Sequence, residues 1–216
     1  MTTTVSPTGS TPELRNVGEV VDGQVHRLQT GYLKDLPGAV ATLAKLRRGA
    51  GKPVEAVPEL VGLTIDHRFY ERFPLDHPRI SDAESAVHEA LTLYALHQQS
   101  KREKGMHRRG RDLGGAVRRL MPPGDIDEPL RKRFIQAQTA QSLETRIDRL
   151  RGIVQLLRSD DLPLDYGLLA DQLYDARTRA GAERVRRAWG RGFQAYRPGK
   201  DDLAAAQNDA GDDPAE

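Results

Sequence analysis

The segment SLETRIDRLRGIVQLLR, residues Ser142 to Arg158, places an apolar side chain at every third or fourth position. This stripe consists of Leu143, Ile147, Leu150, Val154 and Leu157. The spacing matches the period of about 3.6 residues of an α-helix with one buried face. Arginines lie on both flanks of the stripe, where they either bind an anion or extend along the edge of a core towards water. We therefore predict a helix over 142–158.

Apolar residues recur with the same spacing along most of the chain. Long or medium helices are predicted over Glu13–Tyr32, Asp35–Arg48, Ser81–Gln99 and Leu113–Met121, with further helices that begin at Asp127, near Asp165 and before Val185. Short helices are expected around Val54–Leu60 and Asp66–Tyr70. Ser81 and Glu84 fit a capping box, and Gly181 fits the stop of the helix that begins near Asp165. No segment alternates at period two, so the sequence predicts an all-α protein with two packed helical bundles.

The sequence divides the chain into four regions. Residues 1–11 and the acidic residues 199–216 are predicted to be disordered tails, because they hold few apolar residues to bury. Between them, Pro122–Pro123–Gly124 separates an N-terminal helical domain with a basic loop, 12–124, from a C-terminal helical bundle, 125–198.

The chain has no cysteine, which excludes disulfides and thiolate catalysis. It has no apolar run long enough to span a bilayer, and its first residues do not form a signal peptide. We therefore expect no membrane contact and a cytoplasmic location.

The formal net charge of +2 hides an uneven distribution. Residues 199–216 hold one lysine against six acids, whereas residues 101–151 hold fourteen Lys/Arg against seven Asp/Glu. The positive surplus thus lies in one quarter of the chain, which argues for an anionic partner.

The centre of this surplus is KREKGMHRRGRDLGGAVRR, residues Lys101 to Arg119, with eight Lys/Arg against two acids. Gly105 and Gly110 should keep Lys101–Arg111 an open loop. Cations crowded in this way repel one another unless an anion lies over them, and a nucleic-acid backbone is such an anion. Because no aromatic side chain interrupts the segment, we expect contact through phosphates and little base preference. A solvated basic loop without a partner is the alternative.

The candidate nucleic-acid-binding residues are all cationic. The first group consists of Arg47, Arg48, Lys101, Arg102, Lys104, Arg108, Arg109, Arg111, Arg118 and Arg119. Arg47 and Arg48 close a predicted helix, where cations also suit the helix dipole. The second group, some of which can line a protein interface instead, consists of Arg131, Lys132, Arg133, Arg146, Arg149 and Arg151.

Several enzyme signatures are incomplete. The fragment GAGKP lacks the first glycine and the final Ser or Thr of a phosphate-binding loop. His88–Glu89 lacks the second histidine of a zincin, since Thr92 holds that position, so we interpret His88 as an ordinary surface histidine. Asp160–Asp161 fits a solvated helix end. We predict no catalytic residue, no metal site and no cofactor.

Three blocks of the sequence resemble the CasB family, the small subunit of the type I-E CRISPR surveillance complex Cascade. They are KLRRG (Lys45–Gly49), HRRGRDLGGAVRRL (His107–Leu120), and the block from Ser142 to Tyr174, in which Leu-Arg-Gly is followed by Leu-Asp-Tyr. The match spans roughly Leu28 to Tyr196 and rests on the order and spacing of these blocks. The N-terminal and acidic C-terminal extensions look unlike the core of the family.

The resemblance implies a non-enzymatic helical protein with two bundles that takes part in antiviral defence. Family members pair head to tail as two copies beside the backbone and large subunits, the crRNA guide and the target DNA. The resemblance further implies that a basic face helps to hold the R-loop strands, while the guide reads the sequence.

Two other classes of function stay open on the residues alone. A helical sequence-specific duplex-DNA-binding regulator would need a recognition helix, and the Leu113–Met121 segment is short and begins with Gly114–Gly115, which is poor for that purpose. An enzyme with a helical fold would need a nucleophile–base constellation, and none stands out.

Overall fold

A computed structural model describes residues 13–197, so both predicted tails lie outside the described residues. Within 13–197 the chain forms α-helices and short 3-10 turns and no β-strand, which confirms the all-α prediction. The helices are α1 (Asn16–Leu33), α2 (Pro37–Leu46), α3 (Val61–Thr64), α4 (His67–Arg72), α5 (Ile80–His97), α6 (Leu113–Arg119), α7 (Glu128–Thr139), α8 (Leu143–Ser159), α9 (Tyr166–Asp175) and α10 (Arg179–Ala195). No helix in this range is long and apolar enough to cross a membrane.

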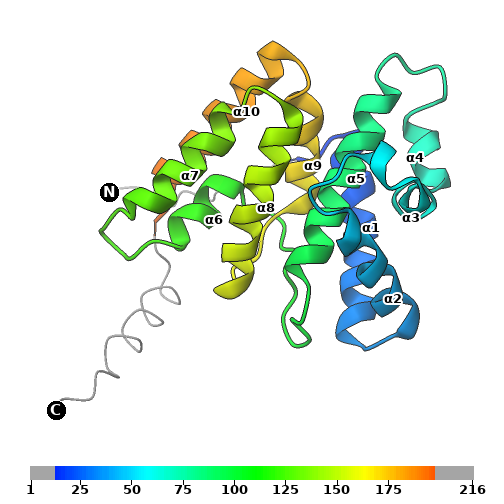
Figure 1. Cartoon of the computed structure of the whole chain (residues 1–216), viewed down its shortest axis with the longest axis horizontal. Coiled ribbons are helices and arrows are strands. Elements are labelled where there is room, and N and C mark those ends of the chain that lie inside the picture. The colour runs from blue at the N-terminus through cyan, green and yellow to red at the C-terminus, as the bar shows by residue number, and fades with distance from the viewer. Residues whose placement is uncertain (1–12, 198–216) are drawn as a thin grey trace, which may run out of the picture.

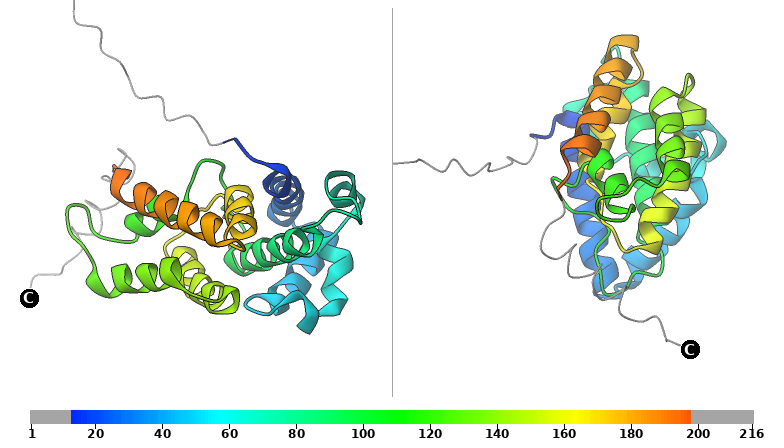
Figure 2. Two further views of the ribbon diagram at one scale, coloured as in Figure 1. Left: turned by 90° about the horizontal axis from the view of Figure 1, so that it is seen from above. Right: turned by 90° about the vertical axis from the view of Figure 1, so that its left-hand side faces the viewer.

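The helices form two groups that meet where α8 and α9 pack against α5 (Figure 1). Helices α1 to α5 lie on one side, where α9 packs most closely against α1 and α5. Helices α6, α7, α8 and α10 lie on the other side, where α6 packs against α10 and α7 against α8 (Figures 1 and 2). The prediction of two packed bundles is confirmed. One continuous cluster of buried apolar side chains runs through both groups, and a domain division at residue 124 stays a prediction.

Three helices begin at the polar residues that the sequence predicted as their starts. The side chains of Asp127, Ser142 and Asp165 each accept a hydrogen bond from a backbone N–H in the first turn of α7, α8 and α9, respectively. These bonds satisfy backbone donors that have no partner within the helix. The cap residues therefore fix where each helix begins.

Two predicted helix signals are wrong. Helix α5 begins at Ile80 with Arg79 at the cap position, so Ser81 lies in its first turn. Helix α9 ends at Asp175, and Gly181 lies in the first turn of α10, which Thr178 caps. A Cβ at Gly181 would overlap the backbone of Asp175, so this glycine permits a close approach of two helices instead of stopping one.

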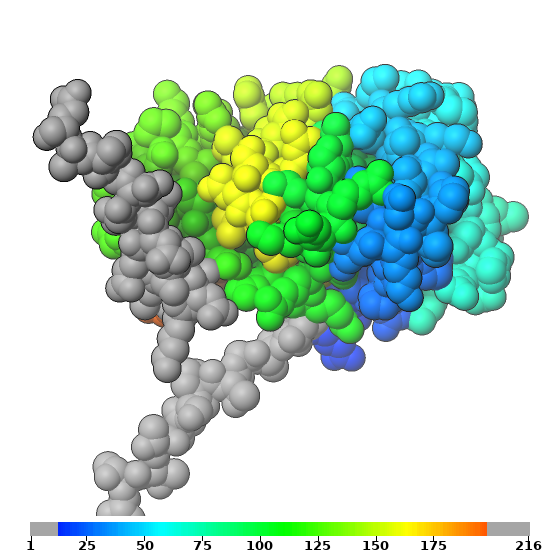
Figure 3. Space-filling view, turned by 90° about the horizontal axis from the view of Figure 1, so that it is seen from below, coloured from blue at the N-terminus to red at the C-terminus, as the bar shows by residue number. Residues whose placement is uncertain are grey.

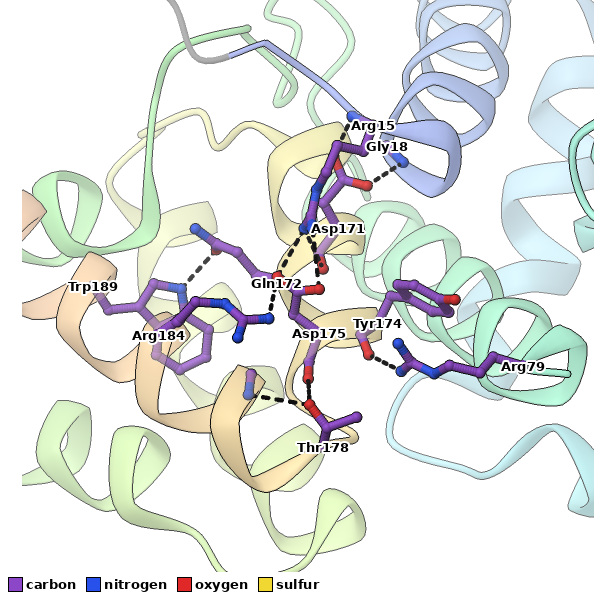
Figure 4. A network of polar contacts seen from close by, with 11 residues as sticks. Arg15, Gly18, Arg79, Asp171, Gln172, Tyr174, Asp175, Thr178, Arg184 and Trp189 are labelled. Atoms are coloured by element: carbon purple, nitrogen blue, oxygen red, sulfur yellow. Dashed lines mark hydrogen bonds and ion pairs between the residues drawn. The ribbon is translucent and has the colours of Figure 1, made fainter.

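Helix α9 is tied to its neighbours by polar contacts (Figure 4). The carboxylate of Asp171, which is 3% exposed, accepts hydrogen bonds from the backbone N–H groups of Arg15 and Gly18, each at 2.8 Å. On the other side of α9, Trp189 Nε1 donates to Gln172 Oε1 at 2.6 Å. The start of α1 and the middle of α10 are therefore both anchored on α9.

Helix α6 lies against the backbone of α10 at Gly114. A Cβ at Gly114 would lie 2.5 Å from Phe193 N and would also overlap the carbonyl oxygen of Trp189. Backbone atoms cannot give way as a flexible side chain can. The two helices therefore require a residue without a side chain at this position.

We predict opposite effects of alanine at two helical glycines. Gly114→Ala should lower the free energy of unfolding by about 2–3 kcal/mol, because α6 must move away from α10. Gly152→Ala, at a site on α8 with open space around the added Cβ, should raise it by roughly 0.5–1 kcal/mol. Urea denaturation of both variants measures this. Equal stability of the Gly114→Ala variant and the wild type would contradict the close approach.

Candidate nucleic-acid interface

The basic loop between α5 and α6 is held from inside by Gln98. The Oε1 atom of this buried side chain accepts a hydrogen bond from Met106 N at 2.9 Å. Its Nε2 atom donates to the carbonyl oxygens of Lys101, at 2.6 Å, and Lys104, at 2.9 Å. One amide group thus fixes three points of the loop backbone, and the loop is not a freely moving segment.

The second half of the loop is held by other parts of the chain. Gln29 of α1 makes two hydrogen bonds to the backbone of His107, at 2.8 and 3.2 Å. Arg108 N donates to Leu164 O at 3.2 Å, and Gly110 N donates to Asp165 Oδ2 at 2.7 Å. Figure 3 shows the green loop segment at the surface between the blue start of the chain and the yellow segment that follows α8.

The side chains of Arg108 and Arg109 extend from this fixed backbone into solvent. Both residues are exposed. Arg108 has no ion pair with another residue in 13–197, and Arg109 Nε lies 3.8 Å from Asp22 Oδ1. A backbone held at both sides loses little conformational entropy when its side chains bind a ligand, so these two arginines are well placed to bind phosphates.

Other cations of the loop are already paired. Lys101 and Lys104 both contact the carboxylate of Asp161, and these hydrogen bonds, with that from Lys101 the larger, hold the pKa of Asp161 below its usual value. Arg102 pairs with Asp35 and lies over the ring of Tyr32, 4.4 Å from its centroid. The positive electrostatic potential at the loop is therefore weaker than the number of Lys and Arg residues in its sequence suggests.

The remaining candidates of the first group are spread over two regions. Arg118 donates to Pro122 O at 3.2 Å, and Arg111, Arg118 and Arg119 are partly buried. Arg47 and Arg48 are exposed beside α2, and Arg47 lines a hollow of about 200 Å³ together with Arg102. Arg47 and Arg48 form no ion pair with another described residue.

The second group of candidates splits into an exposed and a buried part. Arg133, Arg149 and Arg151 line a hollow of about 240 Å³ between α7 and α8. Arg151 also lies close to Gly51, so this side chain of α8 reaches the segment that follows Arg47 and Arg48 in the sequence. On α7, Lys132 is exposed, and Arg131 pairs with Glu128 at 3.0 Å.

Arg146 does not belong to the exposed face. It is 5% exposed and donates to Ala140 O at 3.0 Å and to Ala176 O at 3.4 Å. Burial lowers the pKa of its guanidinium, and the nearby charge of Arg186 adds to this. Arg146 therefore links the turns before α8 and after α9.

Sequence reasoning missed the arginines of α10. The exposed side of this helix carries Arg184, Arg186, Arg187 and Arg191, opposite the buried residues Val185, Trp189 and Phe193. Arg186, Arg187 and Arg191 form no ion pair with another described residue. The run RVRR is visible in the sequence, but counting Lys/Arg against Asp/Glu over long segments hides it, because acids elsewhere offset its charge.

Asp22, His107 and Asp165 place three possible metal-ligand atoms within 4.8 Å of one another. Hydrogen bonds account for this cluster. Tyr166 N donates to His107 Nδ1 at 3.1 Å, so the other ring nitrogen carries the proton that faces Asp22 Oδ1 at 3.0 Å. A neutral His107 thus has no free lone pair for a metal, and the cluster fastens the loop to α1 and α9.

The interpretation of His88 as a surface residue is wrong. His88 is 1% exposed and its Nε2 lies 3.2 Å from Lys52 O. His97 is also fully buried, with Nδ1 2.9 Å from the hydroxyl of Tyr166. Burial lowers the pKa of both histidines, that of His97 to about 3.

We predict that acid destabilises the fold partly through His97. Because the folded-state pKa of about 3 lies below the ordinary histidine value of 6.5, the unfolded chain binds a proton that the folded chain excludes. The stability that comes from keeping His97 buried and neutral is fully present above pH 6.5 and is lost as the pH falls towards 3. Over this range the free energy of unfolding falls by up to about 1.4 kcal/mol per pH unit. Urea denaturation between about pH 7 and about pH 4.5 measures the slope.

The control is His67→Gln, which removes an exposed histidine and should keep the wild-type slope. His97→Gln should be less stable at neutral pH but should show a shallower pH dependence. Equal slopes for the two variants would contradict the assignment.

The chain is thus a small all-α protein with arginine-rich surfaces on a fixed backbone. The family model of CRISPR-associated protein Cse2 (CRISPR_cse2) matches residues 42–193. The crystal structure of CasB from Thermobifida fusca is 58% identical, with a TM-score of 0.78, over 84% of this chain and 99% of that one. The chain belongs to the Cse2 family of CRISPR-associated proteins.

Two further structures share the fold. The crystal structure of M. ruber CasB is 25% identical, with a TM-score of 0.58, over 92% of this chain and 99% of that one. A chain of a structure described as a CRISPR RNA-guided surveillance complex is 22% identical, with a TM-score of 0.58, over 83% of this chain and 96% of that one. At this identity the second likeness concerns the fold alone. No curated protein matches the sequence.

Proposed function

We propose that this chain is a non-catalytic nucleic-acid-binding small subunit of a type I-E CRISPR Cascade complex. Membership of the Cse2 family and the shared fold with a chain of an RNA-guided surveillance complex support this role. The observation that carries the nucleic-acid contact is the basic loop, whose backbone is fixed by Gln98 and Gln29 while Arg108 and Arg109 are exposed.

The exposed arginines suit a backbone contact. Guanidinium groups fork two oxygens of a phosphate, and such contacts carry no information about the base sequence. The protein would hold guide RNA, target DNA and the displaced strand of the R-loop, while base pairing with the guide supplies specificity. The backbone and large subunits, and a second copy of this chain placed head to tail, are the proposed protein partners.

One observation speaks against a sequence-specific duplex-DNA-binding regulator. Residues Leu113 to Val117 of α6 are buried, and Gly114 lies against the backbone of α10. A recognition helix must be free to enter the major groove. Helix α6, the helix nearest to the basic loop in sequence, is therefore not available for base readout.

Co-expression tests membership of the complex. The tagged chain should co-purify with the other Cascade subunits and with crRNA, and its removal should weaken target binding by the remaining complex. Recovery of the chain alone, from cells that assemble the complex from all its other subunits, would contradict the proposal.

We predict that Arg108→Gln with Arg109→Gln weakens oligonucleotide binding without loss of stability. If each arginine contacts one phosphate of a single strand, the slope of log affinity against log salt should fall by about 0.7 per contact, roughly 1.4 in all. The loss should be similar for all sequences, because phosphates carry no base identity. Fluorescence anisotropy at several salt concentrations measures the slope.

The matched control is Arg68→Gln, at an exposed arginine of α4, a helix that lies away from the basic loop in Figure 1. It should leave the slope unchanged. A double variant that binds like the wild type at every salt concentration would show that the loop is only solvated.

A further inference from the structure

We propose that the hollow between α8, the α9–α10 turn and the start of α10 binds a phosphoryl oxyanion. This hollow has a volume of about 510 Å³ and is lined by Arg146, Arg177, Arg179 and Arg186, with Glu183 and Thr178 among its other residues. The α9–α10 turn that lines it lies at the end of the molecule opposite the tip of the basic loop (Figure 1). The proposal therefore goes beyond the proposed function and does not depend on it.

Arg177 and Glu89 form a buried pair beside the hollow. Arg177 donates to Glu89 Oε1 at 2.8 Å, and each side chain is 10% exposed. Burial raises the pKa of Glu89, against the attraction of Arg177. The Nε atom of Arg177 is buried and has no hydrogen-bond partner among the described residues. An unpaired buried donor is costly, and because Arg177 lines the hollow, a small shift of its side chain would let an oxyanion there accept from this group.

Arg146 supplies a second fixed charge. Its guanidinium is 5% exposed and is held by the carbonyl oxygens of Ala140 and Ala176. These carbonyls orient the side chain but do not neutralise it. Arg186 and Arg177 act on Arg146 as like charges, and Glu89 attracts it. The hollow thus gathers three guanidinium groups at a distance where they repel one another, and Glu89 balances only one of them.

The rim of the hollow is accessible to a ligand. Arg186 is exposed and has no ion pair with another residue in 13–197. The Arg179 side chain is 96% exposed and lies 3.9 Å from Glu183, so it is free to move towards a ligand. Four arginines against Glu89 and Glu183 leave an excess of two positive charges, which matches one phosphate group.

The chemistry of the hollow suits a phosphoryl group. Guanidinium groups bind planar or tetrahedral oxyanions through paired N–H donors, and several arginines can share the oxygens of one phosphate. The buried positions of Arg146 and Arg177 mean that these charges are screened little by salt. The phosphoryl group can come from free phosphate or from a nucleic-acid backbone.

Inorganic phosphate at constant ionic strength tests the site. The wild-type melting temperature should rise with phosphate, in a saturable way, beyond the rise with chloride. Arg186→Gln should weaken this phosphate affinity at least about fivefold, equal to about 1 kcal/mol. Without phosphate, this variant should melt no lower than the wild type, because one repulsive charge is removed from Arg146.

The matched control is Arg187→Gln, which changes the same charge on the neighbouring exposed residue of α10, outside the hollow. This variant should keep the wild-type phosphate affinity. The proposal is overturned if phosphate stabilises the wild type no more than chloride, or if the two variants weaken binding equally, since the effect would then be general electrostatics.

A second arm separates the two sources of the phosphoryl group. Single-stranded oligonucleotides are titrated into both variants at the same salt concentrations. Weaker binding by Arg186→Gln than by Arg187→Gln assigns the site to a nucleic-acid backbone, and equal binding assigns it to free phosphate. The Arg108/Arg109 double variant should bind inorganic phosphate normally, so failure of the proposed function and failure of this site are distinguishable.

Discussion

The two hydrogen bonds between Asp171 and the start of α1 are the contact on which the arrangement of the helices depends. A carboxylate that is 3% exposed is costly unless it is hydrogen-bonded. Burial raises its pKa, and the N–H donors of Arg15 and Gly18 oppose this rise. A Cβ at Gly18 would lie 2.8 Å from Gly167 O, so only a glycine lets α1 approach α9 closely enough for these bonds.

The same anchoring determines where the basic loop lies. Helix α9 begins at Tyr166, directly after Leu164 and Asp165, whose backbone and side-chain atoms hold Arg108 and Gly110. From α1, Gln29 holds His107 on the other side. A shift of α1 against α9 would therefore pull on both attachments of the loop. The positions of the exposed arginines therefore depend on how the core packs, although these side chains bury no apolar surface in it.

The sequence predicted features that depend on near neighbours and missed those that depend on distant ones. Asp127, Ser142 and Asp165 cap helices through residues three positions away, so their roles are visible locally. Gly181 fits a helix stop equally well in the sequence, and only the backbone of Asp175 explains its place. The basic segment was identified, but its contacts with Asp161, Asp35 and Gln29 join residues more than fifty positions apart. The stripe places Arg146 on one flank of a helix but does not show that neighbouring turns cover that flank, so the sequence alone does not distinguish it from a phosphate-binding arginine.

The positive charge that the basic loop presents to solvent depends on its ion pairs with other parts of the chain. The contact of Lys104 with Asp161 lies at the surface, where the Lys104 side chain is 64% exposed. Exposed ion pairs of this kind contribute little to stability, so a phosphate can replace Asp161 as the partner of Lys104 at small cost. Arg108 and Arg109 are on a fixed backbone and are available from the start. A polyanion would therefore meet these two arginines first and draw Lys104 away from Asp161 afterwards, and the affinity of the loop would grow with the number of phosphates in reach.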